Sequence, residues 1–402
     1  MGLIVQKYGG TSVKDAERVM NVARRVTNAY KEGNNVVVAV SAQGDTTDDL
    51  IAKGKEINPN ASKREMDMLL ATGEQISISL LAMAIEKLGY PVISLTGWQA
   101  GVVTDTNYGV ARIKRIDAER IKSELDKRRI VVVAGFQGLN KYDDITTLGR
   151  GGSDTSAVAL AAALHADVCE IYTDVDGVYT ADPRIVDNAF KLESISYDEM
   201  LELASLGANV LHNRSVEMAK KYNVKLAVKS SLNDNEGTYV KEVEKVEKMI
   251  VRGVTRDNDV ARISLCGVEN TPGKAFQVFR MLAQKGIGVD LIIQSIGDGK
   301  TKDISFTVTE EDLTKALELL DDNKEIVKAR EVKYSSDVSK VSIVGAGMMN
   351  NTGVAATMFE ALYDAHININ MIATSEIKIS VLVARKDAEA AVVAIHDKFL
   401  GK

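Results

Sequence analysis

The sequence predicts an α/β protein with a mainly parallel sheet covered by helices on both faces, followed by a tandem repeat. Three observations support this fold class. Fully apolar, strand-like runs alternate with helical patterns through the first half of the chain. Glycine-rich turns lie between some of these strands and helices. A segment near residue 270 recurs 80 residues later. Continuous apolar strands between helices are typical of parallel sheets that are buried on both faces.

The first half of the chain supplies the strands and helices of this sheet. Strand-like apolar runs are bounded by glycine or polar residues, and helical runs place apolar residues on one face. Gly89 is expected to end the longest helix. The expected strands are Leu3–Val5, Val36–Val40, Ile130–Ala134 and Val168–Tyr172, and the expected helices cover residues 19–26, 65–88 and 157–166.

The character of the chain changes near residue 235, after which a charged, turn-rich stretch precedes the repeat. Segment 270–295 matches segment 350–375 at an offset of 80 residues. A strand precedes each copy and an alternating strand follows it, so each copy predicts a β-turn-α-β-β unit. We expect each unit to pack as a small sheet with helices on one face. We interpret the apolar residues of each repeated helix as helix core.

Composition excludes several classes of protein. The chain has 402 residues, of which 45% are hydrophobic and 26% charged, and this fits two or three globular domains. Its net charge is −6 and it has no Lys/Arg-rich run, so we expect no nucleic-acid partner. Cys169 and Cys266 lie in apolar contexts and are expected to be reduced thiols. Without a signal-peptide pattern or a run of about 20 apolar residues, we expect a cytoplasmic protein with no membrane partner.

The segment Gly149–Thr155 is the most informative part of the sequence. Adjacent glycines let the backbone approach a ligand, and the free N–H groups at a helix start favour an anion. Arg150 can hold a carboxylate or phosphate through two parallel hydrogen bonds. Ser153 or Asp154 is expected to cap the following helix. The alternative interpretation is a glycine-rich turn before a capped helix, without a ligand.

A second glycine turn, Gly9-Gly10, also lies between a strand and a helix. Lys7 places a cation near the carboxyl end of its strand, where α/β sheets bind ligands. One turn with Lys and one with Arg would suit phosphoryl transfer, which depends on positioning and charge neutralisation. The P-loop and dinucleotide glycine motifs are absent from the sequence, so a nucleotide site would belong to another class. A plain surface position for Lys7 is the alternative.

Three further polar stretches are candidate ligand loops. Segment 172–184 is rich in Asp and turn formers, but it lacks the Glu that a calcium loop needs at its twelfth position. We interpret it as facing a nucleotide, with a structural turn as the alternative. Segments 41–48 and 72–75 combine hydroxyls with acidic residues, which could receive a zwitterionic amino acid; capped helix starts are the alternative. The four histidines are scattered and form no cluster with cysteines, so we expect no zinc site, and we assign no residue as a metal ligand.

Together these segments resemble the aspartokinases of the amino acid kinase family, which have tandem C-terminal ACT domains. The motifs KYGGTSV, VSAQGDTTDDL, LLATGEQIS, TLGRGGSDTSA and YTDVDGVYTADPR occur in that family's order. The resemblance covers essentially the whole chain, and the combination of motifs is specific although no single motif is. It implies a three-layer amino acid kinase fold with two ferredoxin-like βαββαβ ACT domains.

The resemblance also implies a reaction and its site. It implies transfer of the ATP γ-phosphoryl group, with Mg²⁺ held mainly by the phosphates, to the β-carboxylate of L-aspartate, on the pathway to lysine, threonine and methionine. The implied catalytic residues are Lys7, Arg150 and Asp154. The implied substrate-binding residues are Ser41, Thr47, Glu74, Arg150, Gly152 and Ser153. The implied nucleotide-binding residues are Lys7, Tyr8, Gly9, Gly10, Thr173, Asp174, Tyr179, Arg184 and Asn209.

Residues 207–215 depart from the family pattern GAKVLHPRS. Asn209 stands where the family commonly has a lysine that reaches toward ATP, and Asn213 stands where it has a proline. Loss of that cation would weaken ATP binding unless a nearby lysine replaces it. This departure is the one reason to consider a catalytically weak amino-acid sensor as an alternative function. A kinase for another amino-acid carboxylate is the second alternative.

The repeats carry the implied regulation, which is feedback inhibition by lysine, threonine or both. The implied effector-binding residues are Asn270, Gly273, Ala275, Gln294, Thr352, Val354, Asn368, Ile369, Ser375 and Glu376; plain turns are the alternative for the exposed ones. ACT domains usually pair, so we expect a homodimer. In some relatives an internal start makes a separate regulatory subunit; here Met249 precedes IVRGVT at the domain boundary, and its use as such a start is left open.

The resemblance divides the chain into four parts. The expected ranges are 1–235 for the kinase domain, 236–256 for a linker and first regulatory strand, 257–335 for the first ACT domain and 336–402 for the second. The catalytic expectation depends on one spatial condition. The two glycine turns must come together so that Lys7 and Arg150 face a common pocket.

Overall fold

The computed structural model describes residues 2–207, 210–242, 249–295 and 299–401. The chain divides into two compact units. The first unit consists of Met1–Val178, Lys191–Ser205 and Asn209–Val246; the second consists of Tyr179–Phe190, Leu206–Ala208 and Glu247–Lys402. Segment 179–190 therefore belongs with the C-terminal part of the chain, although the strands before and after it lie in the first unit.

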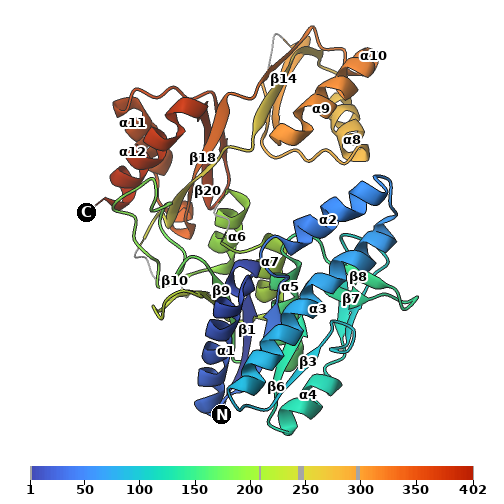
Figure 1. Ribbon diagram of the computed structural model, residues 1–402. Coiled ribbons are helices and arrows are strands. Elements are labelled where there is room, and N and C mark those ends of the chain that lie inside the picture. The colour runs from blue at the N-terminus through green and yellow to red at the C-terminus, as the bar shows by residue number, and fades with distance from the viewer. Residues whose placement is uncertain (1, 208–209, 243–248, 296–298, 402) are drawn as a thin grey trace. The chain divides into compact units, whose positions relative to one another are not determined.

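The first unit is an α/β structure, as the alternation of apolar runs predicts (Figure 1). Its strands are β1 (Leu3–Tyr8), β2 (Asn35–Val40), β3 (Val92–Leu95), β4 (Val102–Thr104), β5 (Ile113–Ile116), β6 (Ile130–Ala134), β7 (Gln137–Leu139), β8 (Ile145–Thr147), β9 (Val168–Thr173), β10 (Ser194–Ile195), β11 (Leu226–Ser230) and β12 (Thr238–Val240). Its helices are η1 (Gly10–Val13), α1 (Ala16–Lys31), α2 (Thr46–Ile57), α3 (Lys63–Lys87), α4 (Glu119–Asp126), α5 (Gly152–Leu164), α6 (Tyr197–Ser205) and α7 (Asn213–Tyr222).

The main sheet has the strand order β10-β12-β11-β9-β1-β2-β6-β3 within the described residues. All neighbouring pairs from β11 to β3 are parallel, and β12 joins the sheet antiparallel to β11. Strands β2 and β6 are buried almost throughout, which explains why their sequences are continuous apolar runs. Four shorter strands form a second sheet with the order β5-β4-β7-β8.

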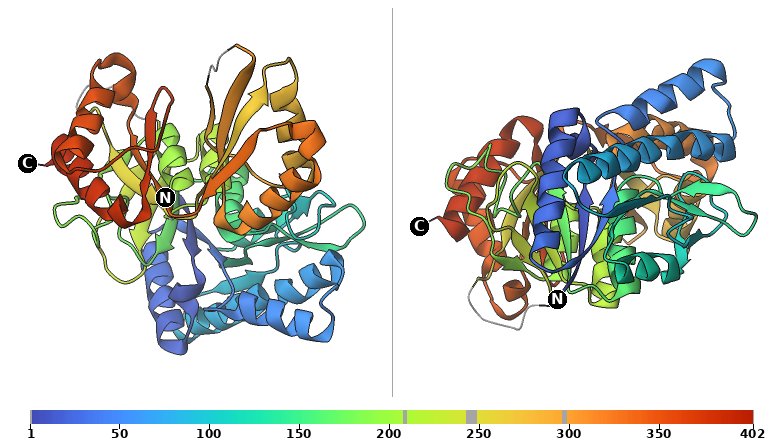
Figure 2. Two further views of the ribbon diagram at one scale, coloured as in Figure 1. Left: turned by 90° about the horizontal axis from the view of Figure 1, so that it is seen from above. Right: turned by 60° about the horizontal axis from the view of Figure 1, so that its bottom comes forward.

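Helices cover both faces of the main sheet. Helices α1 and α3 lie side by side on one face, and their apolar residues form one core cluster with β1, β2 and β6 (Figures 1 and 2). Helix α5 contacts β1, β2 and β9. The side chains of Asp15 and Ser62 accept hydrogen bonds from the first turns of α1 and α3. Gly89 follows α3 with a φ of +84°, as its predicted role at the end of that helix requires.

Helix α3 is the one helix among the described residues that is long and apolar enough to resemble a membrane span. In the fold, however, 56% of its most apolar window is buried, and it packs against α1 and β6. It also buries Asp67 and Glu74, each with hydrogen-bond partners inside the protein. We therefore interpret α3 as a core helix of the first unit.

The second unit contains the tandem repeat. Its strands are β13 (Gly253–Asp257), β14 (Ala261–Glu269), β15 (Ile292–Gln294), β16 (Thr301–Val308), β17 (Glu331–Ser335), β18 (Val338–Val344), β19 (Met371–Thr374) and β20 (Lys378–Ala384). Its helices are α8 (Lys274–Gln284), α9 (Glu310–Asp322), α10 (Lys324–Val327), η2 (Ala346–Asn350), α11 (Val354–Asp364), η3 (Arg385–Asp387) and α12 (Ala388–Leu400). Each copy forms a small sheet with helices, as the repeat predicts.

The two small sheets differ in where their edge strand comes from. The first copy has the order β15-β16-β14-β17 and is continuous in sequence. The second has the order β13-β18-β20-β19, so β13, which precedes the first copy, completes the sheet of the second. Strand β13 directly precedes the first copy in the sequence, but it cannot pair with β14, because β14 already pairs with β16 on one side and β17 on the other. The edge of β18 is the position that β13 occupies.

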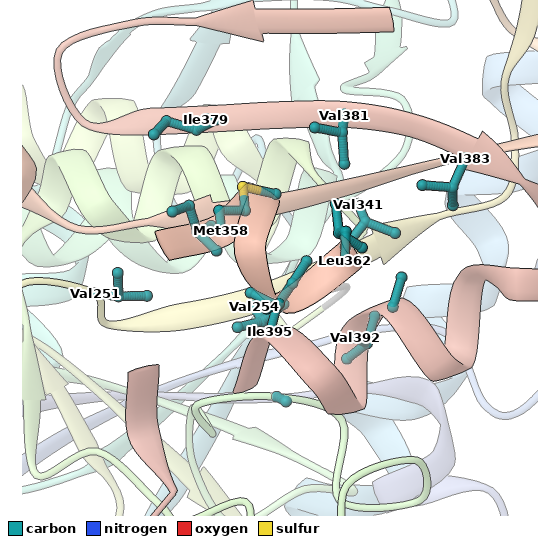
Figure 3. Close-up of a cluster of buried hydrophobic side chains, with 14 of the residues drawn as sticks. Val251, Val254, Val341, Met358, Leu362, Ile379, Val381, Val383, Val392 and Ile395 are labelled. Atoms are coloured by element: carbon teal, nitrogen blue, oxygen red, sulfur yellow. The ribbon is translucent and has the colours of Figure 1, made fainter. Parts of the chain in front are cut away.

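The core of the second copy includes residues from distant parts of the chain. Figure 3 shows Val254 of β13 among side chains of the second copy, including Leu362 and Ile395. Ala181 and Val186, from segment 179–190, belong to the same cluster. Thr180 accepts a hydrogen bond from the Val254 N–H at 2.7 Å, and its hydroxyl lies 2.9 Å from the buried His396 Nε2. These contacts explain why segment 179–190 belongs to the second unit.

Candidate active site

Parallel strands of the main sheet bring several predicted residues to one edge. Strands β2 and β1 end in register at Val40 and Tyr8, and Tyr8 is in register with Tyr172, the next-to-last residue of β9. The loops that follow are tied together, because Ser41 N–H donates to the Tyr8 carbonyl and Ser231 N–H donates to the Thr173 carbonyl. The carboxyl ends of parallel strands are the usual ligand-binding edge of an α/β sheet.

An ion pair links the two predicted glycine turns. Lys7 Nζ lies 2.7 Å from Asp154 Oδ1, and both side chains are 13% exposed. Lys7 lies in β1, just before Gly9, whereas Asp154 lies in the first turn of α5, just after the second glycine turn. Lys7 and Asp154 therefore meet at the same edge of the sheet, although 147 residues separate them in sequence.

The first glycine turn passes very close to other backbone. A Cβ atom on Gly10 would lie 2.6 Å from the Ala42 carbonyl oxygen, so only glycine fits there. Gly9 lies beside the Lys7 ammonium. The Tyr8 ring is fully buried and stacks on Tyr172 with ring centroids 4.6 Å apart. Only the main chain of Tyr8 is thus available for the predicted contact with a nucleotide.

Glu74 presents an unsatisfied carboxylate oxygen. The residue is 2% exposed, its Oε1 accepts the Ala42 N–H at 3.0 Å, and its Oε2 has no hydrogen-bond partner among the described residues. Burial raises the pKa of Glu74 to about 7, against the effect of the Ala42 hydrogen bond. A cation placed beside Oε2 would satisfy this oxygen and favour the ionised form.

The chain neighbours of Ser41 and Thr47 contact helix α3 beside Glu74. Helix α3 packs against this region at Gly73, where a Cβ would lie 2.9 Å from the Ala42 Cβ and 3.5 Å from the Thr46 methyl. Ser41 precedes Ala42, and Thr47 lies in the first turn of α2; both are partly exposed. The structure therefore places Ala42 and Thr46, the chain neighbours of Ser41 and Thr47, against the part of α3 that carries Gly73 and Glu74.

The second glycine turn presents Arg150 to a pocket. Arg150 is exposed and lines a pocket of about 940 Å³ in the first unit. Lys7 is not among the residues that line this pocket, so the expectation that Lys7 and Arg150 face a common pocket stays a prediction. Ser153 is buried and packs against Gly135, which follows β6. The pocket contains many cations; its charged residues and histidine are Lys63, Arg112, Arg150, His212, Arg214, Glu217 and Lys221.

The predicted cap of α5 is wrong. The helix begins at Gly152, its N-cap is Gly151 with a φ of +66°, and no side chain caps it. Ser153 and Asp154 therefore lie inside the first turn. Asp154 instead pairs with Lys7, and its negative charge remains favourable near a helix N-terminus.

The predicted nucleotide loop is divided between the two units. Thr173 ends β9 and donates its hydroxyl hydrogen to Asp174 at 3.0 Å, and both belong to the first unit. Tyr179 and Arg184 belong to the second unit, where Asp182 binds the Arg184 guanidinium. Asn209 lies outside the described residues.

The predicted effector residues lie at the ends of helices and strands in the second unit. Thr352 and Val354 line a pocket of about 450 Å³ at the start of α11, together with Lys398 of α12. Gly273 and Ala275 begin α8, Asn270 precedes it and Gln294 ends β15. The remaining predicted residues are Asn368 and Ile369 between α11 and β19, and Ser375 and Glu376 in the turn before β20.

The sequence reasoning missed Asp67 and Arg214. Asp67 is 1% exposed and accepts the Thr147 hydroxyl at 2.6 Å. Burial raises its pKa, although its hydrogen bonds oppose that shift. Arg214 donates to the carbonyls of Leu148 and Ala111. The signal for Asp67 was its position seven residues before Glu74, on the same face of one helix. No sequence signal assigned a partner to Arg214.

Comparison with known proteins identifies the family. The amino acid kinase family model matches residues 2–230, and an ACT domain model matches residues 263–323 and 341–399. The aspartokinase of Bacillus sp. (strain MGA3) is 52% identical over 400 residues, which are 99% of this chain and 97% of that protein.

Two solved structures of E. coli aspartokinase III, one in complex with aspartate and ADP and one with lysine and aspartate, are each 26% identical to this chain. Their TM-scores are 0.81 and 0.79, the matches cover 98% and 99% of this chain, and each covers 99% of the solved chain. This chain therefore belongs to the amino acid kinase family and carries ACT domains C-terminal to the region that matches that family.

Proposed function

We propose that this chain is an ATP-dependent aspartate kinase. It transfers the ATP γ-phosphoryl group to the β-carboxylate of L-aspartate, gives 4-phospho-L-aspartate, and takes the first step toward lysine, threonine and methionine in the cytoplasm. The observation that carries the proposal is the Lys7–Asp154 pair, which joins the two glycine turns at the carboxyl edge of the sheet. The names of the relatives support aspartate as the substrate.

The aspartate site would use complementary charges. The unsatisfied Glu74 oxygen is suited to the substrate ammonium, and the exposed Arg150 guanidinium is suited to its α-carboxylate. Ser41 and Thr47 would supply hydroxyls, and Gly152 and Ser153 would contact the substrate or its phosphate. These groups would leave the β-carboxylate as the free end of the substrate, directed at the nucleotide.

The nucleotide site would lie on the Lys7 side of the same edge. Lys7 would shift from Asp154 toward the transferring phosphoryl group, and the main chain of Gly9 and Gly10 can approach phosphates closely because it carries no side chains. Thr173 and Asp174 would contact the nucleotide. The roles of Tyr8, Tyr179, Arg184 and Asn209 remain proposals that rest on the family resemblance.

The proposed Mg²⁺ would accompany the nucleotide. No group of three carboxylate, histidine or cysteine side chains that could hold a metal occurs among the described residues. Asp174 is exposed and could complete the coordination of an ion held by phosphate oxygens. When bound, the ion would neutralise charge on the phosphates.

The chemical step would be an in-line displacement. An oxygen of the aspartate β-carboxylate attacks the γ-phosphorus, the bond to the bridging oxygen of ADP breaks, and ADP leaves with that electron pair. Carboxylate oxygen needs no deprotonation, so no general base is required. Lys7 would stabilise the negative charge on the phosphoryl oxygens in the transition state.

We also propose that lysine, threonine or both inhibit the enzyme through the ACT domains. One solved relative is a complex with lysine and aspartate. The pocket of about 450 Å³ lined by Thr352 and Val354 is large enough for an amino acid.

We propose that the protein forms a homodimer. The use of an internal start at Met249 remains a prediction. We also propose the domain boundaries 1–235 for the kinase domain, 236–256 for the linker and first regulatory strand, 257–335 for the first ACT domain and 336–402 for the second. Strand β13 pairs with β18, so we assign it to the second ACT domain although it precedes the first.

The test is an assay of acyl phosphate formation. Purified protein with ATP, Mg²⁺ and L-aspartate should yield a product that hydroxylamine traps as a hydroxamate, and L-glutamate should yield far less. Added lysine or threonine should reduce the rate. No hydroxamate at any aspartate concentration, together with amino-acid binding in calorimetry, would reject the proposal in favour of a catalytically weak sensor.

A further inference from the structure

Arg150 is the one residue with a long side chain in a crowded turn of glycines. Gly149 and Gly151 have φ values of +76° and +66°, which favour glycine. A Cβ on Gly151 would lie 2.1 Å from the His212 ring, and a Cβ on Gly152 would lie 2.8 Å from the Phe136 ring. The turn is therefore packed on several sides, and the direction of Arg150 depends on the segments that hold it.

Arg214 holds the turn from the side of α7. Its guanidinium donates one hydrogen bond to the Leu148 carbonyl, directly before the turn, and another to the Ala111 carbonyl at 3.0 Å. Ala111 N–H in turn donates to the Thr147 carbonyl at 2.9 Å. One planar cation thus ties two separate segments together beside Gly149. A lysine could not bridge both carbonyls in this way.

Asp67 holds the same two segments from the side of α3. Its Oδ2 accepts the N–H groups of Gly109 at 2.9 Å and Thr147 at 3.0 Å, and its Oδ1 accepts the Thr147 hydroxyl at 2.6 Å. Gly109 lies next to Gly149, since a Cβ on Gly149 would lie 3.1 Å from the Gly109 carbonyl oxygen. Three hydrogen bonds to one carboxylate fix the strand before the turn and the loop beside it.

Neither Asp67 nor Arg214 forms an ion pair with any described residue. A buried or half-buried charge costs free energy unless hydrogen bonds compensate it, and here the compensation comes almost entirely from backbone groups around one turn. Charge-assisted hydrogen bonds are shorter and stronger than neutral ones, so both residues are suited to fixing backbone position.

We propose that Asp67 and Arg214 are positioning residues that clamp the Gly149–Gly152 turn from two sides and so aim the Arg150 side chain at the substrate carboxylate. This inference rests on the proposed role of Arg150 in binding L-aspartate. The clamp does not touch the substrate. Its effect passes through the turn, and it acts on aspartate binding rather than on nucleotide binding.

Steady-state kinetics with varied aspartate and varied ATP test the clamp. Arg214→Ala and Asp67→Ala should each raise the KM for aspartate about ten- to hundredfold, since small misplacements of binding groups have effects of this size. The KM for ATP should change less than about twofold. A merely structural role would change both constants together or lower only the amount of folded enzyme.

Conservative variants provide matched controls. Asp67→Asn keeps an oxygen that can accept the two backbone N–H groups, so its KM for aspartate should stay within about threefold of the wild-type value. Arg214→Lys keeps the charge but loses the bridge, so it should behave nearly like Arg214→Ala. Lys221→Gln removes a cation from the same pocket without touching the turn, and its effect should be less than about twofold.

A double variant separates the clamp from the proposed role of Arg150. If Arg214 acts through Arg150, Arg150→Ala/Arg214→Ala should have nearly the same KM for aspartate as Arg150→Ala alone. Additive effects, or a normal KM in Arg214→Ala, would overturn the clamp while leaving the proposed function intact. If Arg150→Ala itself binds aspartate normally, the role of Arg150 is wrong, and a wild-type enzyme without activity would reject the proposed function.

Discussion

The two glycine turns at the edge of the sheet present their cations in different ways. The first turn is crowded by backbone, because a Cβ on Gly10 would meet the Ala42 carbonyl oxygen, and its cation Lys7 is already paired with Asp154. The second is crowded by side chains, such as His212 over Gly151, and its cation is exposed in a pocket.

The difference indicates that the two turns serve different steps of the reaction. A cation paired with a carboxylate inside the fold is held in place and can exchange its partner for a phosphate, as Lys7 would. An exposed arginine in a pocket is suited to capturing a carboxylate from solution, as Arg150 would. We therefore expect substitutions at the first turn to affect mainly the chemical step and substitutions at the second to affect mainly aspartate binding.

The largest effect is expected at Lys7. Lys7→Ala should lower kcat by at least about a hundredfold, because a preorganised charge at the transferring group typically contributes this much to transition-state stabilisation. Steady-state rates with both substrates saturating measure the change. The exposed Lys14, which follows the same turn, is the control, and Lys14→Ala should retain nearly full activity. Near-normal kcat in Lys7→Ala would remove the catalytic role assigned to the first turn.

Arg150→Ala should act mainly on the other constant. We expect the KM for aspartate to rise about ten- to hundredfold, with a smaller change in kcat, because a bidentate contact to the α-carboxylate is lost. The exposed Arg115 on β5 is the matched control, and Arg115→Ala should behave like wild type. A selective loss of kcat in Arg150→Ala would contradict the proposed division between the turns.

Substitutions of the glycines test how each turn is supported. Gly10→Ala and Gly151→Ala should each destabilise the fold by about 1–3 kcal/mol, measured by urea unfolding, because both added methyl groups clash. Adding His212→Ala should recover part of the loss in Gly151→Ala, since the clashing atoms are in that side chain. Gly33, with a φ of +90° and open space, is the control for backbone strain alone. Equal costs at all three glycines would mean that crowding does not distinguish them.

Much of this site could be predicted from sequence because its parts are local. Lys7 before a diglycine and Arg150 between glycines are visible as short motifs. The end of the first strand could likewise be expected at the ligand-binding edge of the sheet. The sequence did not predict that Lys7 pairs with Asp154 or that Glu74 accepts the Ala42 N–H, because helices α5 and α3 bring those carboxylates to the edge. The Asp67 and Arg214 contacts could not be predicted in the same way, because they join segments 80 and 66 residues apart.

The regulatory half shows the same limit. The repeat predicts two small sheets, but not that β13 would complete the second of them or that Thr180 would lie beside His396. Both depend on which sheet edge and which core remain open after the nearer segments have packed. For the same reason the sequence grouped Tyr179 and Arg184 with Thr173, whereas the fold divides this loop between two units.

The smallest expected effect concerns pH and sharpens the assignment of Glu74. Its pKa of about 7 lies above its unfolded value, so its contribution to stability is present at low pH and is lost as pH rises through 7. Wild type should therefore melt a few degrees below Glu74→Gln at pH 8, but not at pH 4.5. The KM for aspartate should fall from pH 6 to pH 8, because the substrate ammonium requires the ionised carboxylate. A pH-independent difference would contradict the burial of an uncompensated Glu74.

A crystal structure of the protein with L-aspartate, Mg²⁺ and a non-hydrolysable ATP analogue would show directly whether Arg150, Glu74 and Lys7 contact the two substrates. We expect one aspartate molecule to have its α-carboxylate on Arg150, its ammonium on Glu74 and its β-carboxylate facing a γ-phosphate that contacts Lys7. An aspartate bound with Arg150 turned away, or a γ-phosphate distant from Lys7, would contradict it.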